Sequence, residues 1–189
     1  MALHQTGMRV GMAILLFFQL CGWVISIGGT AHATNECRED TDEWKENPGG
    51  AQPIAERGHL QPFPFNTADE SRAYDCGIHF SLDWWIIAFQ FFMIIFGYLA
   101  VFVEFFHTKY TTMALFAIAT TLYTLYTSIY VKLGYQFSGG SHDDNTVAQG
   151  FKTAAAGGIV VCVCNYIFMF LFGAEESASE EIPADTKAT

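Results

Sequence analysis

Charged residues are scarce in this chain, and long parts of it have none. Asp, Glu, Lys and Arg make up 15% of its 189 residues, whereas a soluble domain carries about 25%. Each of four stretches is about as long as the 20 apolar residues with which a helix crosses a bilayer. These stretches, which lack Asp, Glu, Lys, Arg and His, are Val10–Gly29, Trp84–Val103, Thr111–Val131 and Thr153–Gly173. The composition therefore excludes an ordinary soluble domain.

Basic residues are especially few, and familiar catalytic motifs are missing. There are 9 Lys and Arg against 19 Asp and Glu, which gives a net charge of −10. A surface this acidic repels phosphate groups, so neither nucleic acid nor anionic lipid is expected as a partner. The sequence has no Gly-rich phosphate loop, no His-Glu-x-x-His motif and no nucleophile elbow. We therefore expect no catalytic residues, no metal ligands, no cofactor and no enzymatic activity.

Four apolar stretches predict an all-α integral membrane protein with a four-helix transmembrane bundle. Helices satisfy their own backbone groups where no water is present. Arg9 precedes the first stretch, and basic residues at the end of a spanning helix favour the cytoplasmic side. The protein is expected in the plasma membrane or an endomembrane. The predicted layout is a cytoplasmic N-terminus (1–9), spanning segments (10–29, 84–103, 111–131, 153–173), extracytoplasmic loops (30–83, 132–152), a cytoplasmic turn (104–110) and an acidic cytoplasmic tail (174–189).

The first apolar stretch also has features of a cleavable signal peptide. Thr30–Ala33 reads Thr-Ala-His-Ala, which fits an Ala-x-Ala cleavage site. The apolar run before it is longer than the usual 7–15 residues of a signal peptide. That length favours an uncleaved first helix, although cleavage would leave the orientation of the other helices unchanged.

Two cysteines lie near the ends of the first extracytoplasmic loop. Cys37 and Cys76 flank a segment rich in Pro and Gly. Thiols outside the cytosol tend to pair, so we expect a disulfide between them that closes this loop. A loop of this length gives a stabilisation of about 4 kcal/mol in the chain-entropy model.

The third apolar stretch is unusually rich in hydroxyl groups. At 100° per residue, its Tyr and Thr side chains form two adjacent stripes, and the opposite stripe is aliphatic, with Ile118, Leu122, Leu125 and Ile129. The aliphatic side is expected to face lipid. The polar side is expected to face other helices or a partner protein, and a pore lining is the alternative. This polar side consists of Thr120, Tyr123, Thr124, Tyr126, Thr127 and Tyr130.

The other three stretches each carry one amide side chain, and two of them carry closely spaced small residues. Gln19, Gln90 and Asn165 are predicted to form interhelical hydrogen bonds. Small residues four apart allow two helix backbones to approach closely. We expect such close packing at Gly22 and Ser26, and at Gly157 and Gly158.

This layout resembles that of MARVEL and claudin-type tetraspan proteins. The resemblance rests on four helices, a large first outer loop with a cysteine pair, a short inner turn and a small second loop. The Gly-Leu-Trp signature of claudins is absent. The resemblance implies a role in organising membrane or in trafficking, and it carries no functional residue over to this chain.

A second resemblance, to the vitamin K epoxide reductase and DsbB families, suggests a membrane thiol oxidoreductase. Those proteins relay electrons from loop cysteines to a Cys-x-x-Cys pair. Here the pair is Cys162-x-Cys164, and residues two apart point to different sides of a helix. These two cysteines are therefore interpreted as packing residues.

The sequence leads to one favoured function and two alternatives. The favoured function is a non-enzymatic membrane protein acting by lateral contacts, as an organiser or as an accessory subunit of a larger complex. Its expected partners are membrane lipids, other integral membrane proteins or further copies of itself. The alternatives are the thiol oxidoreductase and a small pore or carrier.

Overall fold

The computed structural model describes residues 2–46, 80–103, 109–136, 138 and 142–180, and its described elements are all α-helices. They are α1 (Ala2–Glu46), α4 (Ser81–Phe102), α5 (Lys109–Gln136) and α6 (His142–Glu180). Each is long and apolar enough to cross a membrane. The prediction of an all-α bundle with four spanning helices is confirmed.

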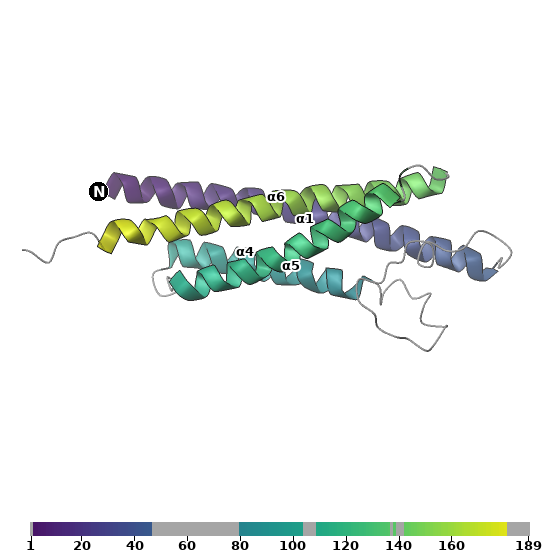
Figure 1. The fold of residues 1–189 in the computed structure, drawn as a ribbon, viewed down its shortest axis with the longest axis horizontal. Coiled ribbons are helices and arrows are strands. Elements are labelled where there is room, and N and C mark those ends of the chain that lie inside the picture. Colours follow the sequence, from purple (N-terminus) through teal and green to yellow (C-terminus); the bar gives the residue numbers. More distant parts are fainter. Residues whose placement is uncertain (1, 47–79, 104–108, 137, 139–141, 181–189) are drawn as a thin grey trace, which may run out of the picture.

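The four helices form a ring in which each one packs against two neighbours. The contacting pairs are α1 with α6, α6 with α5, α5 with α4, and α4 with α1. Figure 1 shows that α1 begins and α6 ends at the same end of the bundle. We call this the termini end and the opposite end the loop end. Side chains that point to the centre of the ring can therefore meet from all four helices.

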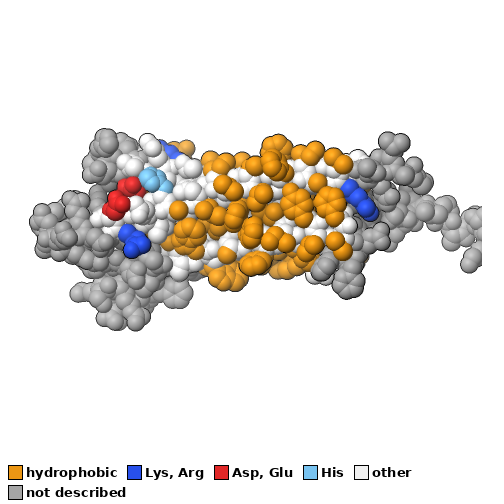
Figure 2. Space-filling model, turned by 180° about the vertical axis from the view of Figure 1, so that it is seen from behind, with side chains coloured by type: hydrophobic (Ala, Val, Ile, Leu, Met, Phe, Trp, Pro, Cys, Tyr) orange, Lys and Arg blue, Asp and Glu red, His pale blue; other side chains and the backbone are white. Residues whose placement is uncertain are grey.

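The outer surface of the bundle is apolar over its middle. Figure 2 shows a broad belt of hydrophobic side chains on one face, with the charged side chains gathered at its two ends. Phe92, Phe170 and Trp85 are 65%, 76% and 62% exposed, as expected for side chains that face lipid tails or the membrane interface. The chain is an integral, multi-pass membrane protein.

Helices α1 and α6 pack with their backbones in close contact. A methyl group added to Gly157 would lie 2.5 Å from the carbonyl oxygen of Gly22 and 2.6 Å from the amide nitrogen of Ser26. One added to Gly150 would lie 3.1 Å from the amide nitrogen of Ala33. Glycine is therefore required along this helix pair because there is no room for a side chain. Gly158 instead faces α5, where Thr127 occupies the space that a methyl group would need.

Two helices extend well beyond the predicted spans. Helix α1 continues from residue 30 to Glu46, and α6 includes residues 142–152 and 174–180. Polar helix-forming residues carry α1 past the apolar stretch, with an Asn35–Glu39 hydrogen bond of 2.7 Å and a His32–Glu36 pair at 3.7 Å. Most of the turn predicted at 104–110 lies outside the described residues.

Helix α4 starts earlier than predicted, and this changes the position of one acidic residue. The prediction placed Asp83 in the loop, whereas α4 begins at Ser81 and Asp83 lies in its first turn. An acidic side chain there interacts favourably with the positive end of the helix dipole. The spanning part of the chain therefore includes a carboxyl group.

Candidate functional site

Polar side chains are buried in the interior of the bundle, where helices on opposite sides of the ring contact each other. All of them are at most 6% exposed. We call this set the polar core. It consists of Gln19, Ser26, Thr30, Asp83, Gln90, Tyr123, Tyr126, Tyr130 and Asn165.

Three amide side chains form the end of the polar core that lies nearest the termini end of the bundle. The amide nitrogen of Gln19 donates to the side-chain oxygen of Asn165. Asn165 in turn donates to the side-chain oxygen of Gln90 over 3.4 Å. The structure thus joins α1, α6 and α4 through the three amides for which interhelical hydrogen bonds were predicted.

Hydroxyl groups continue the polar core from the amides toward the loop end. Ser26 donates to the carbonyl oxygen of Ala154 over 3.4 Å. The hydroxyls of Thr30 and Tyr126 are 2.7 Å apart, which joins α1 to α5 across the ring. Gln19 and Thr30 are eleven residues apart on α1, so this part of the polar core is about 16 Å long.

The loop end of the polar core is occupied by Asp83. The hydroxyl of Tyr130 donates a hydrogen bond of 3.1 Å to one carboxylate oxygen. Asp83 is only 6% exposed and forms no ion pair with any described residue. The neighbouring Trp84 and Trp85 are exposed, so the acidic side chain turns inward while the indoles turn outward.

The tyrosine rings of α5 stack along the axis. The centroids of Tyr123 and Tyr126 are 5.1 Å apart, and those of Tyr126 and Tyr130 are 4.4 Å apart. Tyr130 also meets the ring of Phe151 on α6 edge-on, at 5.5 Å. Tilted ring contacts therefore connect the three tyrosines in sequence along α5.

Three buried polar atoms of the core lack a hydrogen-bond partner among the described residues. They are the side-chain oxygen of Gln19, the side-chain nitrogen of Gln90 and the hydroxyl oxygen of Tyr123. Buried polar atoms are nearly always hydrogen-bonded to protein or water. Atoms like these can hydrogen-bond to a small polar species in the interior.

On the other side of the amides, toward the termini end, the buried side chains are apolar except for Thr112. The rings of Phe116 and Phe168 stack with centroids 4.5 Å apart. A methyl group added to Gly97 would lie 2.8 Å from Leu16 and 2.9 Å from Phe116. We call Leu16, Gly97, Phe116 and Phe168 the apolar plug. It takes one residue from each helix and separates the polar core from the termini end.

The polar face predicted on α5 is divided between the interior and the outer surface. Its three tyrosines are fully buried, and Thr120 and Thr127 are 2% and 8% exposed. Thr124, in contrast, is exposed, and its hydroxyl bonds to the carbonyl oxygen of Thr120 at 2.7 Å. Ile118 and Leu125 are 53% and 43% exposed on the opposite side. The tyrosines therefore face the other helices of this chain and cannot form a contact surface for a partner.

The cysteines fall into different environments. Cys21, Cys162 and Cys164 carry free thiols. The sulfur of Cys162 is 3.6 Å from the hydroxyl of Thr124, whereas Cys164 is buried. Cys37 is 1% exposed in α1 near the loop end and is not one of the free thiols. Its predicted partner Cys76 lies outside the described residues, so the disulfide stays a prediction.

No protein-family model and no curated protein sequence matches this chain. The fold is similar to that of a solved channel. The crystal structure of the Chlamydomonas reinhardtii LCI1 channel superimposes with a TM-score of 0.63 and 17% sequence identity, over 89% of this chain and 97% of that one. At this identity the similarity concerns the fold alone, and it extends over nearly the whole of both chains.

This result supports the tetraspan architecture inferred from the sequence and gives no support to the finer resemblance to MARVEL or claudin-type proteins. The matching structure is described as a channel, and it is not a MARVEL or claudin protein. The resemblance rested on loop sizes and helix order, which unrelated four-helix proteins share. The tetraspan architecture is retained, and the assignment to MARVEL or claudin-type proteins is not.

The polar core contains two residues that were not singled out from the sequence. Asp83 was assigned to the loop, and Thr30 to the segment after the first span. A signal for both was present, since Asp83 precedes Gln90 by seven residues and Thr30 follows Ser26 by four. Both spacings place the residues on one helix face.

Proposed function

We propose that this protein is a small channel whose permeation path follows the polar core, and that its permeant is the proton. The observation that carries the proposal is the line of buried polar groups from Asp83 to the three amides. Polar and ionisable side chains are costly to bury in a membrane and typically mark a path for ions or protons. A bundle that only needed to be stable could fill its axis with apolar side chains.

The chemistry of the polar core favours protons over larger permeants. Hydroxyl groups both donate and accept hydrogen bonds, so a chain of them can pass a proton along. Tyr123, Tyr126 and Tyr130 are 0% exposed, so their rings occupy the axis. A solute or hydrated ion would have to displace these rings, whereas a proton need only move between neighbouring oxygens. Asp83 offers a carboxyl group at the loop end to receive it.

The apolar plug supplies a reason for the path to be closed. Hydrophobic constrictions stop conduction by excluding water, and the Phe116–Phe168 stack lies between the amides and the termini end. Opening requires these two rings to separate. The similarity of the fold to LCI1 supports a channel in general terms, and it says nothing about the permeant.

A flux measurement on reconstituted protein tests the proposal. Liposomes with a trapped pH-sensitive dye and a valinomycin-imposed potassium diffusion potential should acidify or alkalinise faster with the protein than without it. Asp83→Asn should reduce this flux to the protein-free rate, and chloride flux should be unchanged by the protein. Proton flux equal to that of protein-free liposomes at every imposed potential, both in the wild type and in Phe168→Ala, would reject the channel proposal.

The sequence favoured lateral contacts, as an organiser or accessory subunit. The surface expected to make these contacts is not on the outside of the bundle. The α5 tyrosines on which it relied are inside the bundle. The channel proposal also involves no enzymatic step, in agreement with the expectation that the protein is not an enzyme. The thiol oxidoreductase alternative gains no supporting contact, because Cys162 and Cys164 are free thiols in different surroundings.

We also propose the Cys37–Cys76 disulfide, at the loop end of the bundle. It is supported by the full burial of Cys37, which is not among the free thiols. A variant in which Cys21, Cys162 and Cys164 are replaced by Ala should bind no maleimide when denatured without reductant, and two after reduction. Two reactive thiols before reduction would exclude the bond.

A further inference from the structure

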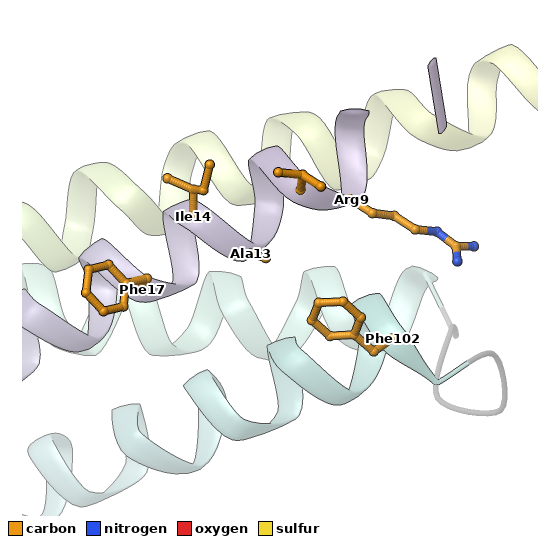
Figure 3. Close-up of a pocket in the computed structure, with 6 residues that line it drawn as sticks. Arg9, Ala13, Ile14, Phe17 and Phe102 are labelled. Atoms are coloured by element: carbon orange, nitrogen blue, oxygen red, sulfur yellow. The ribbon is translucent and has the colours of Figure 1, made fainter. Parts of the chain in front are cut away.

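A groove runs along the outside of the bundle between the first turns of α1 and the last turn of α4, at the termini end. Its volume is about 530 Å³, within the range of roughly 300–1,000 Å³ that ligand sites occupy. Figure 3 shows its lining residues, which come from both helices. They are Arg9, Val10, Ala13, Ile14, Phe17 and Phe102.

The lining of the groove is apolar except at one end. Val10, Ile14, Phe17 and Phe102 are 54%, 51%, 55% and 61% exposed, so they face the lipid side of the bundle. Ala13 lies between them, and its small side chain leaves the space that the groove occupies. Arg9 and Phe17 are eight residues apart, so the groove follows α1 for about 12 Å.

Arg9 stands at the outer end of this groove. In Figure 3 its side chain leaves α1 and extends away from the other labelled side chains, toward the termini end of the bundle. It is exposed and forms no ion pair with any described residue. The guanidinium group is a planar fork of donors that matches the oxygens of a phosphate. A cation at the end of an apolar groove, with no ion-pair partner among the described residues, is complementary to an anionic head group with an acyl chain attached. This local complementarity differs from the expectation that the acidic chain as a whole repels anionic lipid.

We propose that this groove binds an anionic phospholipid from the leaflet at the termini end. The acyl chain lies along Ala13 between Phe17 and Phe102, and the phosphate accepts hydrogen bonds from Arg9. Basic residues between transmembrane helices bind anionic head groups in this way. The site lies outside the ring of helices, so it is independent of the polar core and of the proposed channel function.

Lipid binding to the purified protein tests this site. In a neutral detergent, native mass spectrometry can follow titration with palmitoyl-oleoyl phosphatidylglycerol and, separately, with the phosphatidylcholine of the same acyl chains. The wild type should bind the anionic lipid about fivefold more tightly, as expected for one basic residue near a membrane surface. Equal affinity for the two lipids in the wild type would overturn the proposal.

Matched variants separate the head group from the acyl chain. Arg9→Gln should abolish the preference and leave phosphatidylcholine binding unchanged, whereas Ala13→Leu should fill the groove and weaken both lipids. Arg38→Gln makes the same change of charge at an exposed position near the other end of α1 and should retain the preference. A preference that survives Arg9→Gln would contradict the assignment. Displacement of the lipid by millimolar inorganic phosphate would show that the site recognises phosphate alone and would also overturn it.

Discussion

Tyr130 of α5 donates a hydrogen bond of 3.1 Å to Asp83 of α4, and both side chains are buried at the loop end of the bundle. No described residue provides Asp83 with a positive charge. The phenol is therefore the group that compensates for removing this carboxyl group from water. A buried polar group that loses its only partner costs more than the bond itself contributes.

Removing that phenol should destabilise the protein. Tyr130→Phe is expected to lower the free energy of unfolding by about 1–2 kcal/mol, because the buried carboxyl group of Asp83 loses the hydrogen bond from this hydroxyl. The measurement is unfolding by SDS in mixed micelles, followed by helical circular dichroism. Tyr135→Phe is the control, since Tyr135 is 76% exposed near the end of the same helix. Equal losses in the two variants would show that the hydrogen bond to Asp83 is not stabilising.

Replacements of Gln19, Gln90 and Asn165 should have coupled effects on the free energy of unfolding. Asn165→Leu removes the hydrogen bonds to both Gln19 and Gln90 and leaves their amides buried, which should cost about 1–3 kcal/mol. Replacing all three amides by Leu removes the unpaired groups as well, so the triple variant should be at least as stable as Asn165→Leu alone. A triple variant whose loss equals the sum of three single losses would contradict this coupling. The same SDS titration serves for the wild type, the three single Leu variants and the triple variant.

The packing of α1 against α6 predicts opposite effects on stability for two Gly→Ala changes, one inside this contact and one outside it. Gly157→Ala should destabilise the bundle by about 1–3 kcal/mol, because the new methyl group meets the backbone of α1 at 2.5 Å. Gly28→Ala has no neighbour within 4 Å and should stabilise α1 by about 0.5–1 kcal/mol. Thermal unfolding in detergent distinguishes the two. A stable Gly157→Ala variant would mean that the two helices are further apart than described.

The apolar plug should control the rate of proton flux. Phe168→Ala opens the ring stack with Phe116 and is expected to raise the flux in liposomes above that of the wild type. Phe170→Ala is the matched control, because Phe170 lies two residues away on α6 and is 76% exposed to lipid. An unchanged rate in Phe168→Ala, with the protein folded, would place the closed point of the path elsewhere.

The spanning helices could be predicted because the absence of charge is a strong and local signal. Each apolar stretch is long enough to cross a bilayer, and the helix that contains it follows directly. The ends of the helices could not be predicted in the same way. Residues 30–46 are polar yet helical, and nothing in their composition distinguishes a helix in water from a loop.

The polar core could be predicted in part. Periodicity placed Tyr123, Tyr126 and Tyr130 on one face of α5, and that face is inside the bundle. Periodicity alone does not say whether such a face meets the same chain or a partner. The inward turn of Asp83 depends on where α4 starts, a difference of three residues from the predicted span. The apolar plug could not be predicted. It depends on which side chains of four separate helices lie at the same level along the bundle axis, and only the packed structure specifies this.

The central claim is that protons cross the membrane along the polar core, between Asp83 and the apolar plug. It is tested most directly by combining Phe168→Ala and Asp83→Asn in one protein. Proton flux is then measured with the trapped dye in liposomes under a fixed potassium diffusion potential. The account predicts that Phe168→Ala raises the flux and that Phe168→Ala with Asp83→Asn returns it to the rate of protein-free liposomes. A double variant that conducts as fast as Phe168→Ala alone would show that protons bypass Asp83, and would contradict the account.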